Sequence, residues 1–476
     1  MPDYNNSRLT LLRGACSFLI MLLLLGVFFA PNALVHAQEG TTYPVYIVRS
    51  GDTLSDIAMR FYTTVDDLKS LNNWTNADTL HPGDRLMVPG LSGMKGVLVS
   101  INTPLGASLT TMSRRSQTQP NDLVKLNKLT SPSELYVGRE VVIAQEEGGT
   151  PLDTLPAMLP GETYLEAALL SGENPWQLAL LNRLESPNAA LPMDTYFAPA
   201  EEAGENNLAI PGVKSILINN LPFRQGNTWV VKVEQSEPLE ITAELNGVKP
   251  PFFSTQEGYQ VALGGIHALV EPGVYPLNLT FTYQNGQTYR FEQLVMIASA
   301  DFEWDAPLYV DPATLDDENV AKEDEIFTEL VAHATPVQQW NGIFINPTQE
   351  PVCVRSEFGS RRTYNNDPRL FYHTGLDLGY CGGVDIMAPA KGTVVAAMPD
   401  LIVRGNTIVI DHGLGVYTTY MHLKDILVEK GDIVEPGQLI GHMGNTGRSI
   451  GPHLHFQVDV NGIPVNPSTW LYREFP

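Results

Sequence analysis

The segment GPHLHF, Gly451–Phe456, places two histidines one residue apart directly after a Gly-Pro turn. Successive side chains of an extended strand point to opposite faces of a sheet, so His453 and His455 share one face. The apolar residues that alternate with them, Leu454 and Phe456, then face a core. Two imidazoles on one face indicate either a polar sheet edge or a chemical site. Other segments of the chain distinguish these alternatives.

A second segment, HTGLDLG, carries His373 and Asp377 four residues apart. Strand periodicity predicts that His373, Gly375 and Asp377 share one face of a strand. Two histidines and one aspartate provide three ligands, the number found in a catalytic zinc site that keeps a fourth position for water. The helical motif His-Glu-x-x-His is absent from the sequence, so another group must handle the proton, and His422 in TTYMHL is the remaining candidate.

Length and charge limit the function classes. The chain has 476 residues and a net charge of −24, from 29 Lys and Arg against 53 Asp and Glu. This length favours about three to five domains rather than one core. The negative charge disfavours nucleic acid and anionic membrane surfaces as partners.

The N-terminal residues follow the order of a secretory signal. Arg8 and Arg13 precede an apolar run from Ala15 to Ala30, and the small-residue motif VHA ends at Ala37. We therefore expect residues 1–37 to be a signal peptide that is cleaved after Ala37. An uncleaved membrane anchor is the alternative, because the apolar run is long for a signal. Both alternatives predict an exported chain, with no stable membrane partner unless the segment is retained.

Two cysteines, Cys353 and Cys381, remain beyond the signal segment. In an exported setting we expect them to form a disulfide, and two free buried thiols are the alternative. Closing a loop of about 29 residues would stabilise the fold by roughly 3–4 kcal/mol in the chain-entropy model. So few cysteines exclude a thiolate metal site and favour a zinc-like ion with nitrogen and oxygen ligands.

A threefold repeat follows the signal segment. Its first copy has the pattern of strand, helix, helix and strand, with Thr53 as a helix N-cap. A constant shift of 55 residues maps Asn72 onto Asn127 and then onto Asn182, and the same shift matches glycine and leucine positions. We therefore predict three copies of one small unit. Their ranges are 45–90, 97–145 and 152–200.

The pattern changes to period two from about residue 210 to residue 298, with hairpin signals at Asn246-Gly247 and Asn285-Gly286. This pattern predicts an immunoglobulin-like β-sandwich over residues 208–300, which we expect to be a spacer or a docking platform. The acidic segment 301–337 is predicted to form a helical linker in which Ile326 and Leu330 pack on a neighbour.

The first repeat resembles the lysin motif in VRSGDTLSDIAMRF, LNNW and HPGDRLMVP. That family binds glycans containing N-acetylglucosamine, such as peptidoglycan and chitin. The resemblance implies a glycan groove between the turn of Gly51, Asp52, Thr53 and Leu54 and the segment around Asn76 to Pro82. Copies two and three are degenerate at the opening turn, so repeats that keep the fold without binding sugar are the alternative, favoured for the third copy.

Residues 338–476 resemble the lysostaphin-type zinc endopeptidases in SEFGSRR, HTGLDLG, APAKGTVVAA, NTIVIDHGLGVYTTYMHL, GNTGRSIGPHLHFQV and VNPSTWL. These enzymes cut peptide bonds in peptidoglycan stems or cross-bridges. The resemblance implies an antiparallel β domain with one zinc ion on His373, Asp377 and His455. It also implies that His422 and His453 are the catalytic histidines, which activate the water and steady the tetrahedral intermediate.

These features predict a multidomain, mainly β protein that acts as an exported cell-wall hydrolase in the cell wall, the periplasm or outside the cell. Its partner would be peptidoglycan, through both its glycan and its peptide stems. The alternative is a non-hydrolytic regulator that activates cell-wall amidases, since some relatives of this class have lost metal ligands. Five intact polar positions favour the enzyme. His412 and His442 are assigned structural or surface roles, and Tyr364 and Tyr372 are candidates for lining a substrate groove.

Overall fold

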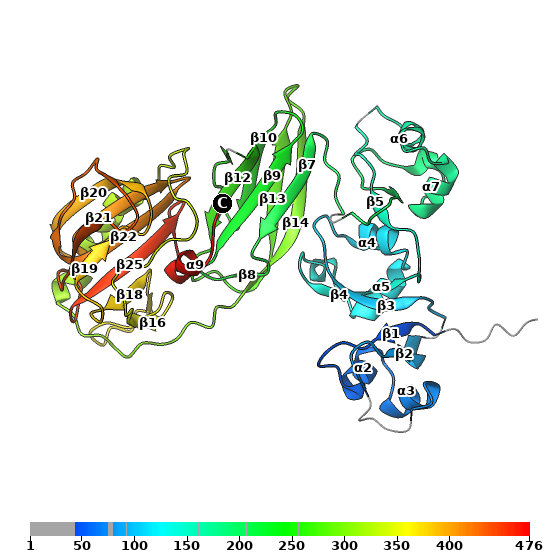
Figure 1. The fold of residues 1–476 in the computed structure, drawn as a ribbon, viewed down its shortest axis with the longest axis horizontal. Coiled ribbons are helices and arrows are strands. Elements are labelled where there is room, and N and C mark those ends of the chain that lie inside the picture. Colours follow the sequence, from blue (N-terminus) through cyan, green and yellow to red (C-terminus); the bar gives the residue numbers. More distant parts are fainter. Residues whose placement is uncertain (1–42, 75–79, 92, 160, 205–206, 256) are drawn as a thin grey trace, which may run out of the picture. The chain divides into compact units, whose positions relative to one another are not determined.

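The computed structural model describes residues 43–74, 80–91, 93–159, 161–204, 207–255 and 257–476 (Figure 1). The chain divides into two compact units, one that ends at Gly96 and one from Val97 to Pro476. The predicted signal peptide, residues 1–37, lies outside the described residues. Among the helices that the structure describes, none combines the length and the apolar composition that a membrane crossing requires.

The first repeat has the predicted order of strand, helix, helix and strand. A threonine precedes each helix as its N-cap. The Thr53 hydroxyl accepts from Asp56 N at 3.1 Å, and the Thr64 hydroxyl accepts from Asp67 N at 3.0 Å. The two strands pair in antiparallel fashion. The elements are β1 (Val45–Ile47), α2 (Leu54–Arg60), α3 (Val65–Leu71) and β2 (Arg85–Met87).

The second and third repeats have the same order of elements within the larger unit. The second consists of β3 (Val97–Asn102), α4 (Leu109–Ser116), α5 (Pro120–Asn127) and β4 (Glu140–Gln145). The third consists of β5 (Leu152–Thr154), α6 (Tyr164–Leu170), α7 (Pro175–Leu181) and β6 (Phe197–Pro199). Short 3-10 turns lie at Pro89–Leu91, Pro132–Glu134 and Pro187–Ala189.

One asparagine has the same structural role in all three repeats. The Asn72 amide donates to Leu68 O and to Met87 O at 2.8 Å, and its oxygen accepts from Met87 N at 2.7 Å. Asn127 makes the corresponding three bonds in the second repeat. Asn182 makes them in the third. The recurring asparagine therefore fastens the second helix of each repeat to the last strand.

The β module consists of two four-stranded sheets in the orders β10-β13-β14-β8 and β11-β12-β9-β7, and both contribute to one core. The predicted hairpin at Asn285-Gly286 is confirmed, because it joins β13 to β14. A tight turn also forms at Asn246-Gly247, but the chain then enters the other sheet at β11. The strands are β7 (Val213–Asn219), β8 (Phe223–Arg224), β9 (Thr228–Gln235), β10 (Glu240–Leu245), β11 (Phe253–Ser254), β12 (Tyr259–Gly265), β13 (Gly273–Thr282) and β14 (Thr288–Ala298).

The acidic segment contains the 3-10 turn η5 (Pro312–Leu315) and the predicted helix, α8 (Asp317–Val331). The buried side chains of α8 include Phe327 and Val331, which pack in one cluster with Val409, whereas Ile326 is 40% exposed. The prediction that Leu330 packs on a neighbour is confirmed, because Leu330 packs against this cluster. The prediction for Ile326 is wrong, since Phe327 occupies the buried position beside it.

The C-terminal domain is built on a ten-stranded sheet whose main path is β15-β18-β25-β22-β21-β20-β23. Its described pairs are antiparallel, and β16 and β17 form a separate hairpin. The elements are β15 (Val354–Ser356), β16 (Arg361–Arg362), β17 (Phe371–Tyr372), β18 (Leu376–Gly379), β19 (Asp385–Met387), β20 (Gly392–Leu401), β21 (Gly405–Gly413), β22 (Val416–Ile426), β23 (Ile433–Val434), β24 (Leu439–Met443), β25 (His453–Val460), β26 (Ile463–Val465) and α9 (Pro467–Tyr472).

The β module packs directly on the C-terminal domain. Val230 and Leu263 belong to the same core cluster as Leu454 and Phe456. A hydrogen bond crosses the junction as well: the indole N–H of Trp470 donates to Thr228 Oγ1 at 3.1 Å. The β module is therefore part of the support for the C-terminal sheet and does not form a detached spacer.

The predicted disulfide between Cys353 and Cys381 is present. It connects the residue that precedes β15 to the segment that follows β18. Since β15 and β18 are also paired as strands, this bond closes the edge of the sheet on which Asp377 lies.

Candidate metal centre

The pairing of β18 with β25 brings two of the predicted ligands together. Asp377 lies directly opposite His455 in the antiparallel register, and Gly379 lies opposite His453. Directly opposed residues project on the same face of a sheet, so the carboxylate and both imidazoles share one face. Leu454, on the other face, is fully buried in the core. The predicted alternation of site residues and core residues is confirmed for this strand.

His373 reaches the same point from outside the strand. The sequence predicts a continuous strand through residues 373–378, but β18 begins at Leu376 and His373 precedes a bend at Gly375. A Cβ atom at Gly375 would lie 2.6 Å from His455 Nε2, so the chain passes close against β25 at this bend. The predicted strand is too long here, although His373 still faces Asp377.

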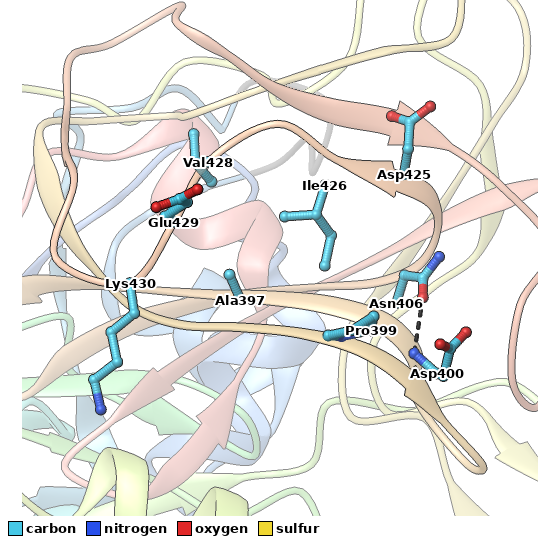
Figure 2. A pocket seen from close by; sticks show the side chains of 9 residues that line it. All are labelled: Ala397, Pro399, Asp400, Asn406, Asp425, Ile426, Val428, Glu429 and Lys430. Carbon is cyan, nitrogen blue, oxygen red and sulfur yellow. Dashed lines mark hydrogen bonds between the residues drawn. The ribbon is translucent and has the colours of Figure 1, made fainter.

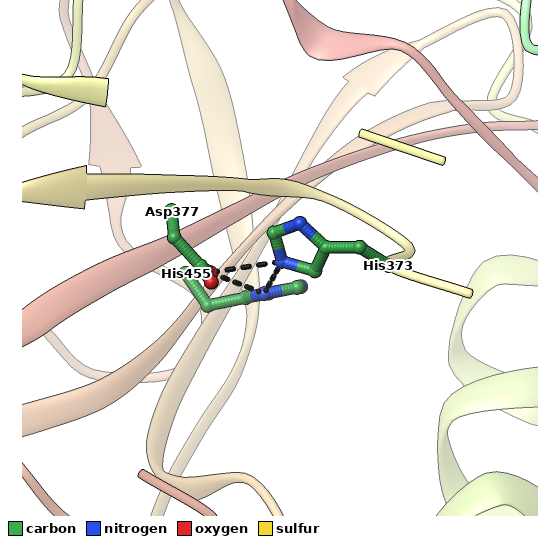
Figure 3. Close-up of side chains that lie close together, drawn as sticks. All are labelled: His373, Asp377 and His455. Atoms are coloured by element: carbon green, nitrogen blue, oxygen red, sulfur yellow. Dashed lines mark hydrogen bonds and ion pairs between the residues drawn. The ribbon is translucent and has the colours of Figure 1, made fainter. Parts of the chain in front are cut away.

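Three ligand atoms converge in a nearly equilateral triangle (Figure 3). His373 Nε2 lies 2.9 Å from Asp377 Oδ1 and 3.0 Å from His455 Nδ1, and the third side of the triangle is 3.0 Å. A tetrahedral zinc ion with bonds of about 2.0–2.1 Å separates its ligand atoms by roughly 3.3 Å. The triangle therefore has close to the size that such an ion requires.

Protonation states also fit a divalent cation. His373 Nδ1–H donates to Glu357 O at 2.9 Å, which leaves the lone pair of Nε2 directed at the cluster. Burial lowers the pKa of His455 to about 4, so its imidazole is neutral at pH 7. Burial would raise the pKa of Asp377, but the imidazoles of His373 and His455 beside its carboxylate hold that pKa well below its usual range. The cluster thus offers two imidazole nitrogens and one ionised carboxylate.

One more observation supports the fit of this donor set to zinc. A neutral His455 carries one ring proton, and its buried Nε2 has no hydrogen-bond partner. The three acceptor atoms, His373 Nε2, Asp377 Oδ1 and His455 Nδ1, lie about 3 Å from one another. At most one proton lies among them, so hydrogen bonds alone cannot satisfy all three. A metal ion satisfies all three at once, and two nitrogens with one carboxylate oxygen suit zinc.

The two predicted catalytic histidines lie beside the triangle. His453 Nδ1–H donates to Gly451 O at 2.8 Å, and His453 Nε2 lies 3.6 Å from Asp377 Oδ1. His422 Nδ1–H donates to Thr446 O at 2.8 Å, and its ring centroid lies 4.9 Å from that of His453. Each imidazole thus has one nitrogen fixed by a backbone carbonyl, which leaves Nε2 as the nitrogen that can accept a proton.

His422 is held in an uncommon environment. Its backbone has a φ of 65°, a conformation that L-residues other than glycine adopt rarely. Burial, together with the neighbouring imidazoles of His453 and His455, lowers the pKa of His422 well below its ordinary value. A neutral imidazole at physiological pH is the form that acts as a base.

Three further polar residues surround the ligands and were missed by the sequence analysis. Ser356 Oγ lies 3.3 Å from His373 Nδ1, and Arg362 Nη1 lies 3.9 Å from Asp377 Oδ2. Asp305 Oδ2 lies 2.9 Å from Arg362 Nη2. The motif SEFGSRR contains two of these residues, but Asp305 belongs to the acidic linker and no spacing rule connects it with the site.

The predicted glycan turn has strong internal constraints. Gly51 has a φ of +90°, and Asp52 accepts from Tyr46 OH at 2.8 Å and from Arg49 N at 2.7 Å. Thr53 is the helix cap described above, and Leu54 is 6% exposed in the core. The facing segment of the predicted groove, Asn76 to Pro82, lies in part outside the described residues.

Other candidate residues lie elsewhere. The hydroxyl of Tyr372 pairs with His267 Nε2 of the β module at 2.9 Å, which directs this side chain to the domain junction rather than to a groove. His442 lies in strand β24, and its two nitrogens face Asp425 at 2.6 Å and Asp385 at 3.6 Å. His442 therefore does not lie in a loop, whereas the 29% exposed fraction of its side chain agrees with the predicted surface position.

A cavity of about 460 Å³ lies among the ends of β20, β21 and β22 (Figure 2). Its lining includes Asp400, Asn406, Asp425 and Glu429, and the Asp400 amide donates to Asn406 Oδ1 at 2.9 Å. None of the three ligand residues lines it. The triangle of His373, Asp377 and His455 is the candidate site, because these side chains can bind a metal ion and the cavity contains none of them.

An antiparallel sheet with a buried His-Asp-His cluster and two flanking imidazoles defines a metal-centred β domain, which follows a series of small repeats. Comparison with protein families identifies these parts. Residues 371–467 match peptidase family M23, and residues 46–89 and 106–144 match the LysM domain. The chain therefore contains an M23 peptidase domain and two LysM domains.

Two curated relatives are similar to part of the chain. Peptidoglycan DD-endopeptidase ShyA of Vibrio cholerae is 42% identical over 120 residues, which cover 25% of this chain and 28% of that protein. DD-carboxypeptidase/endopeptidase Mpg of Neisseria meningitidis is 43% identical over 134 residues, 28% of this chain and 30% of that protein. The chain thus spans less than a third of either relative.

A solved structure is also similar to part of the chain. The catalytic domain of the antimicrobial peptidase lysostaphin from Staphylococcus simulans is 31% identical, with a TM-score of 0.22. The match covers 25% of this chain and 91% of that chain.

Proposed function

We propose that the protein is a zinc-dependent endopeptidase that cleaves peptide bonds in peptidoglycan stems or cross-bridges. The observation that carries this proposal is the triangle of His373, Asp377 and His455, with the imidazoles of His422 and His453 beside it. Both curated relatives carry the name of an endopeptidase, and ShyA is named a peptidoglycan endopeptidase, which supports the same reaction class.

The chain's own residues would position the zinc ion and transfer protons during the reaction. Bound zinc would polarise the scissile carbonyl and lower the pKa of a bound water to about 7. His373, Asp377 and His455 would hold the ion. His453 and His422 would take a proton at Nε2 and return it to the leaving amine, because their Nδ1 atoms are fixed by backbone carbonyls.

We further propose that the two LysM domains hold the glycan of peptidoglycan and so raise the local concentration of peptide substrate. Gly51, Asp52, Thr53 and Leu54 would form one side of the sugar groove of the first repeat. The third repeat, residues 152–200, would serve as a spacer of the same fold. The LysM domains and the peptidase domain would meet peptidoglycan only after export of the protein. Residues 1–37 would direct this export.

The domain boundaries that we propose follow the sequence analysis: 45–90, 97–145, 152–200, 208–300, 301–337 and 338–476. The β module over residues 208–300 would be immunoglobulin-like. Its two sheets with a shared core support that assignment.

The full-length chain tests the proposed function through two substitutions in one strand. His455→Ala is expected to lose stoichiometric zinc, since one of three ligands is removed. His453→Ala is expected to keep close to one zinc per chain and to lower turnover by about 10²–10⁴-fold, because proton transfer is removed. Elemental analysis measures the zinc, and release of new amino termini from purified peptidoglycan measures turnover.

Two results would contradict the proposal. One is a wild-type chain that binds no zinc. The other is equal release of amino termini by the wild type and by His455→Ala.

A further inference from the structure

Part of the acidic linker pairs with the hairpin that precedes His373. Arg361 N donates to Glu303 O and Asp305 N donates to Arg361 O, both at 2.8 Å. Leu308 N then donates to Thr363 O at 3.0 Å. These backbone bonds fix the linker along β16. They bring the Asp305 side chain, from a segment upstream of the matched peptidase region, to the surroundings of the metal ligands.

Asp305 belongs to a compact polar network. The Arg362 guanidinium donates from Nη2 to Asp305 Oδ2 at 2.9 Å and to Ser356 Oγ at 2.6 Å. The Ser356 hydroxyl donates to Asp305 Oδ2 at 3.1 Å. Asp305 is thus the acceptor on which two donors converge, and its carboxylate offsets the charge of Arg362.

This network touches the ligands at two points. Ser356 Oγ lies 3.3 Å from His373 Nδ1, and Arg362 Nη1 lies 3.9 Å from Asp377 Oδ2. Arg362 is 6% exposed, so its charge is shielded poorly by water. A buried cation therefore lies between two carboxylates, of which one is a predicted metal ligand and the other comes from the linker.

We propose that Asp305 is a positioning residue that holds Arg362 by its charge and so leaves the Asp377 carboxylate to the metal. The inference rests on the proposed zinc site. Arg362 and the metal are two cations that compete for one buried carboxylate. Without Asp305 the guanidinium is left with Asp377 as its nearest anion, and this pairing opposes metal binding.

Zinc affinity of the full-length chain, measured by competition with a chromophoric chelator, tests this inference. Asp305→Asn keeps the shape of the side chain and removes its charge, and it is expected to weaken zinc binding by about 10–100-fold. Asp324→Asn is the matched control. Asp324 also belongs to the acidic linker segment and pairs with Arg404 at 2.6 Å, but it is 55% exposed and contacts none of the ligands. The control is expected to bind zinc within about twofold of the wild type.

A second pair of variants separates the proposed role from a loss of folding. Arg362→Met removes the competing cation and is expected to bind zinc at least as tightly as the wild type. The double variant Asp305→Asn with Arg362→Met is expected to recover most of the affinity that Asp305→Asn loses. A merely structural role of Asp305 predicts no recovery, because the linker contact remains altered.

Three results would overturn the inference: wild-type affinity in Asp305→Asn, weaker binding by Arg362→Met, or a double variant no better than Asp305→Asn. If Asp305→Asn does not fold, Arg362→Met alone decides the question by its direction. A wild-type chain without zinc would instead contradict the proposed function, so the two failures are distinguishable.

Discussion

At the scale of single residues, the position of His455 depends on the absence of a side chain opposite its ring. A Cβ atom at Gly375 would lie 2.6 Å from His455 Nε2 and 2.6 Å from Phe456 O. Both distances are shorter than contacts in well-packed proteins allow. Glycine at this bend therefore lets His455 lie flat enough to direct Nδ1 at Asp377.

Gly375→Ala is expected to weaken zinc binding by about tenfold or more, because the added methyl group displaces the His455 ring from the triangle. The zinc dissociation constant of the full-length chain measures the effect. Gly451→Ala provides the control, since a Cβ atom at Gly451 meets no atom within 4 Å. Equal affinities of the two variants would contradict the steric explanation.

The ligand triad could be predicted from the sequence, whereas its supporting groups could not. Strand alternation predicts that His453 and His455 share a face, and the structure has this arrangement. The acceptors that orient the imidazoles are backbone carbonyls of Glu357, Gly451 and Thr446. Every residue type has such a carbonyl, so no sequence pattern marks these positions.

At the scale of elements, His412 shows how the central strands constrain protonation. It lies near the end of β21 and is fully buried. Its Nδ1–H donates to Lys391 O at 2.8 Å, and its Nε2 accepts from Thr418 Oγ1 at 2.8 Å. Burial lowers the pKa of His412 from 6.5 to about 4, so the folded sheet keeps this imidazole neutral where an unfolded chain would protonate it.

The unfolding free energy is therefore expected to fall as the pH decreases from 6.5 to about 4. A folded-state pKa below the unfolded value means that the unfolded chain binds the proton first, so stability is complete above pH 6.5 and is lost below it. The difference between the two pKa values corresponds to about 3 kcal/mol for His412. Urea unfolding of the metal-free chain at pH 7 and pH 4.5 measures the change.

His412→Gln is the control for this assignment. The variant is expected to be less stable than the wild type at pH 7 and to lose about 2 kcal/mol less between pH 7 and pH 4.5. Identical pH dependence in both chains would exclude His412 as the source.

Element types were predicted better than element ends. The βααβ order of the first repeat and the helix in the acidic segment are confirmed, since caps and apolar spacing mark them. The start of β18 was misplaced because the alternation of residues 373–378 continues through a bend that sterics at Gly375 impose. Of the two predicted packing residues of α8, Leu330 is confirmed, and Ile326 was misplaced because it and Phe327 are adjacent and both apolar.

At the scale of the whole molecule, one core crosses the junction between the β module and the C-terminal domain. The sequence contains a signal for this arrangement. Val230 and Val231 are adjacent in β9 and both are fully buried, which requires apolar contacts on both faces of that sheet. One residue packs in the core of the β module and the other in the shared core. The consecutive apolar residues of TWVVKV were interpreted only as alternation.

A fragment of residues 208–476 is expected to unfold in one cooperative transition, because its two parts share a core cluster. Differential scanning calorimetry measures this through the ratio of calorimetric to van't Hoff enthalpy, which should be close to one. Two resolved transitions would contradict the shared core. A fragment of residues 338–476 is expected to melt at a lower temperature, since Trp470 loses its partner Thr228.

The asparagine that fastens each repeat has a consequence for the array as a whole. Asn72, Asn127 and Asn182 secure the fold through backbone groups of the last strand, at a distance in sequence from the turn that begins at Gly51. The bonds that fasten the last strand therefore do not involve the residues of the proposed glycan turn. Under the glycan assignment proposed above, substitutions at a few turn positions would change the number of repeats that bind glycan while these asparagine bonds stay in place, so the valence of the array would vary independently of its architecture.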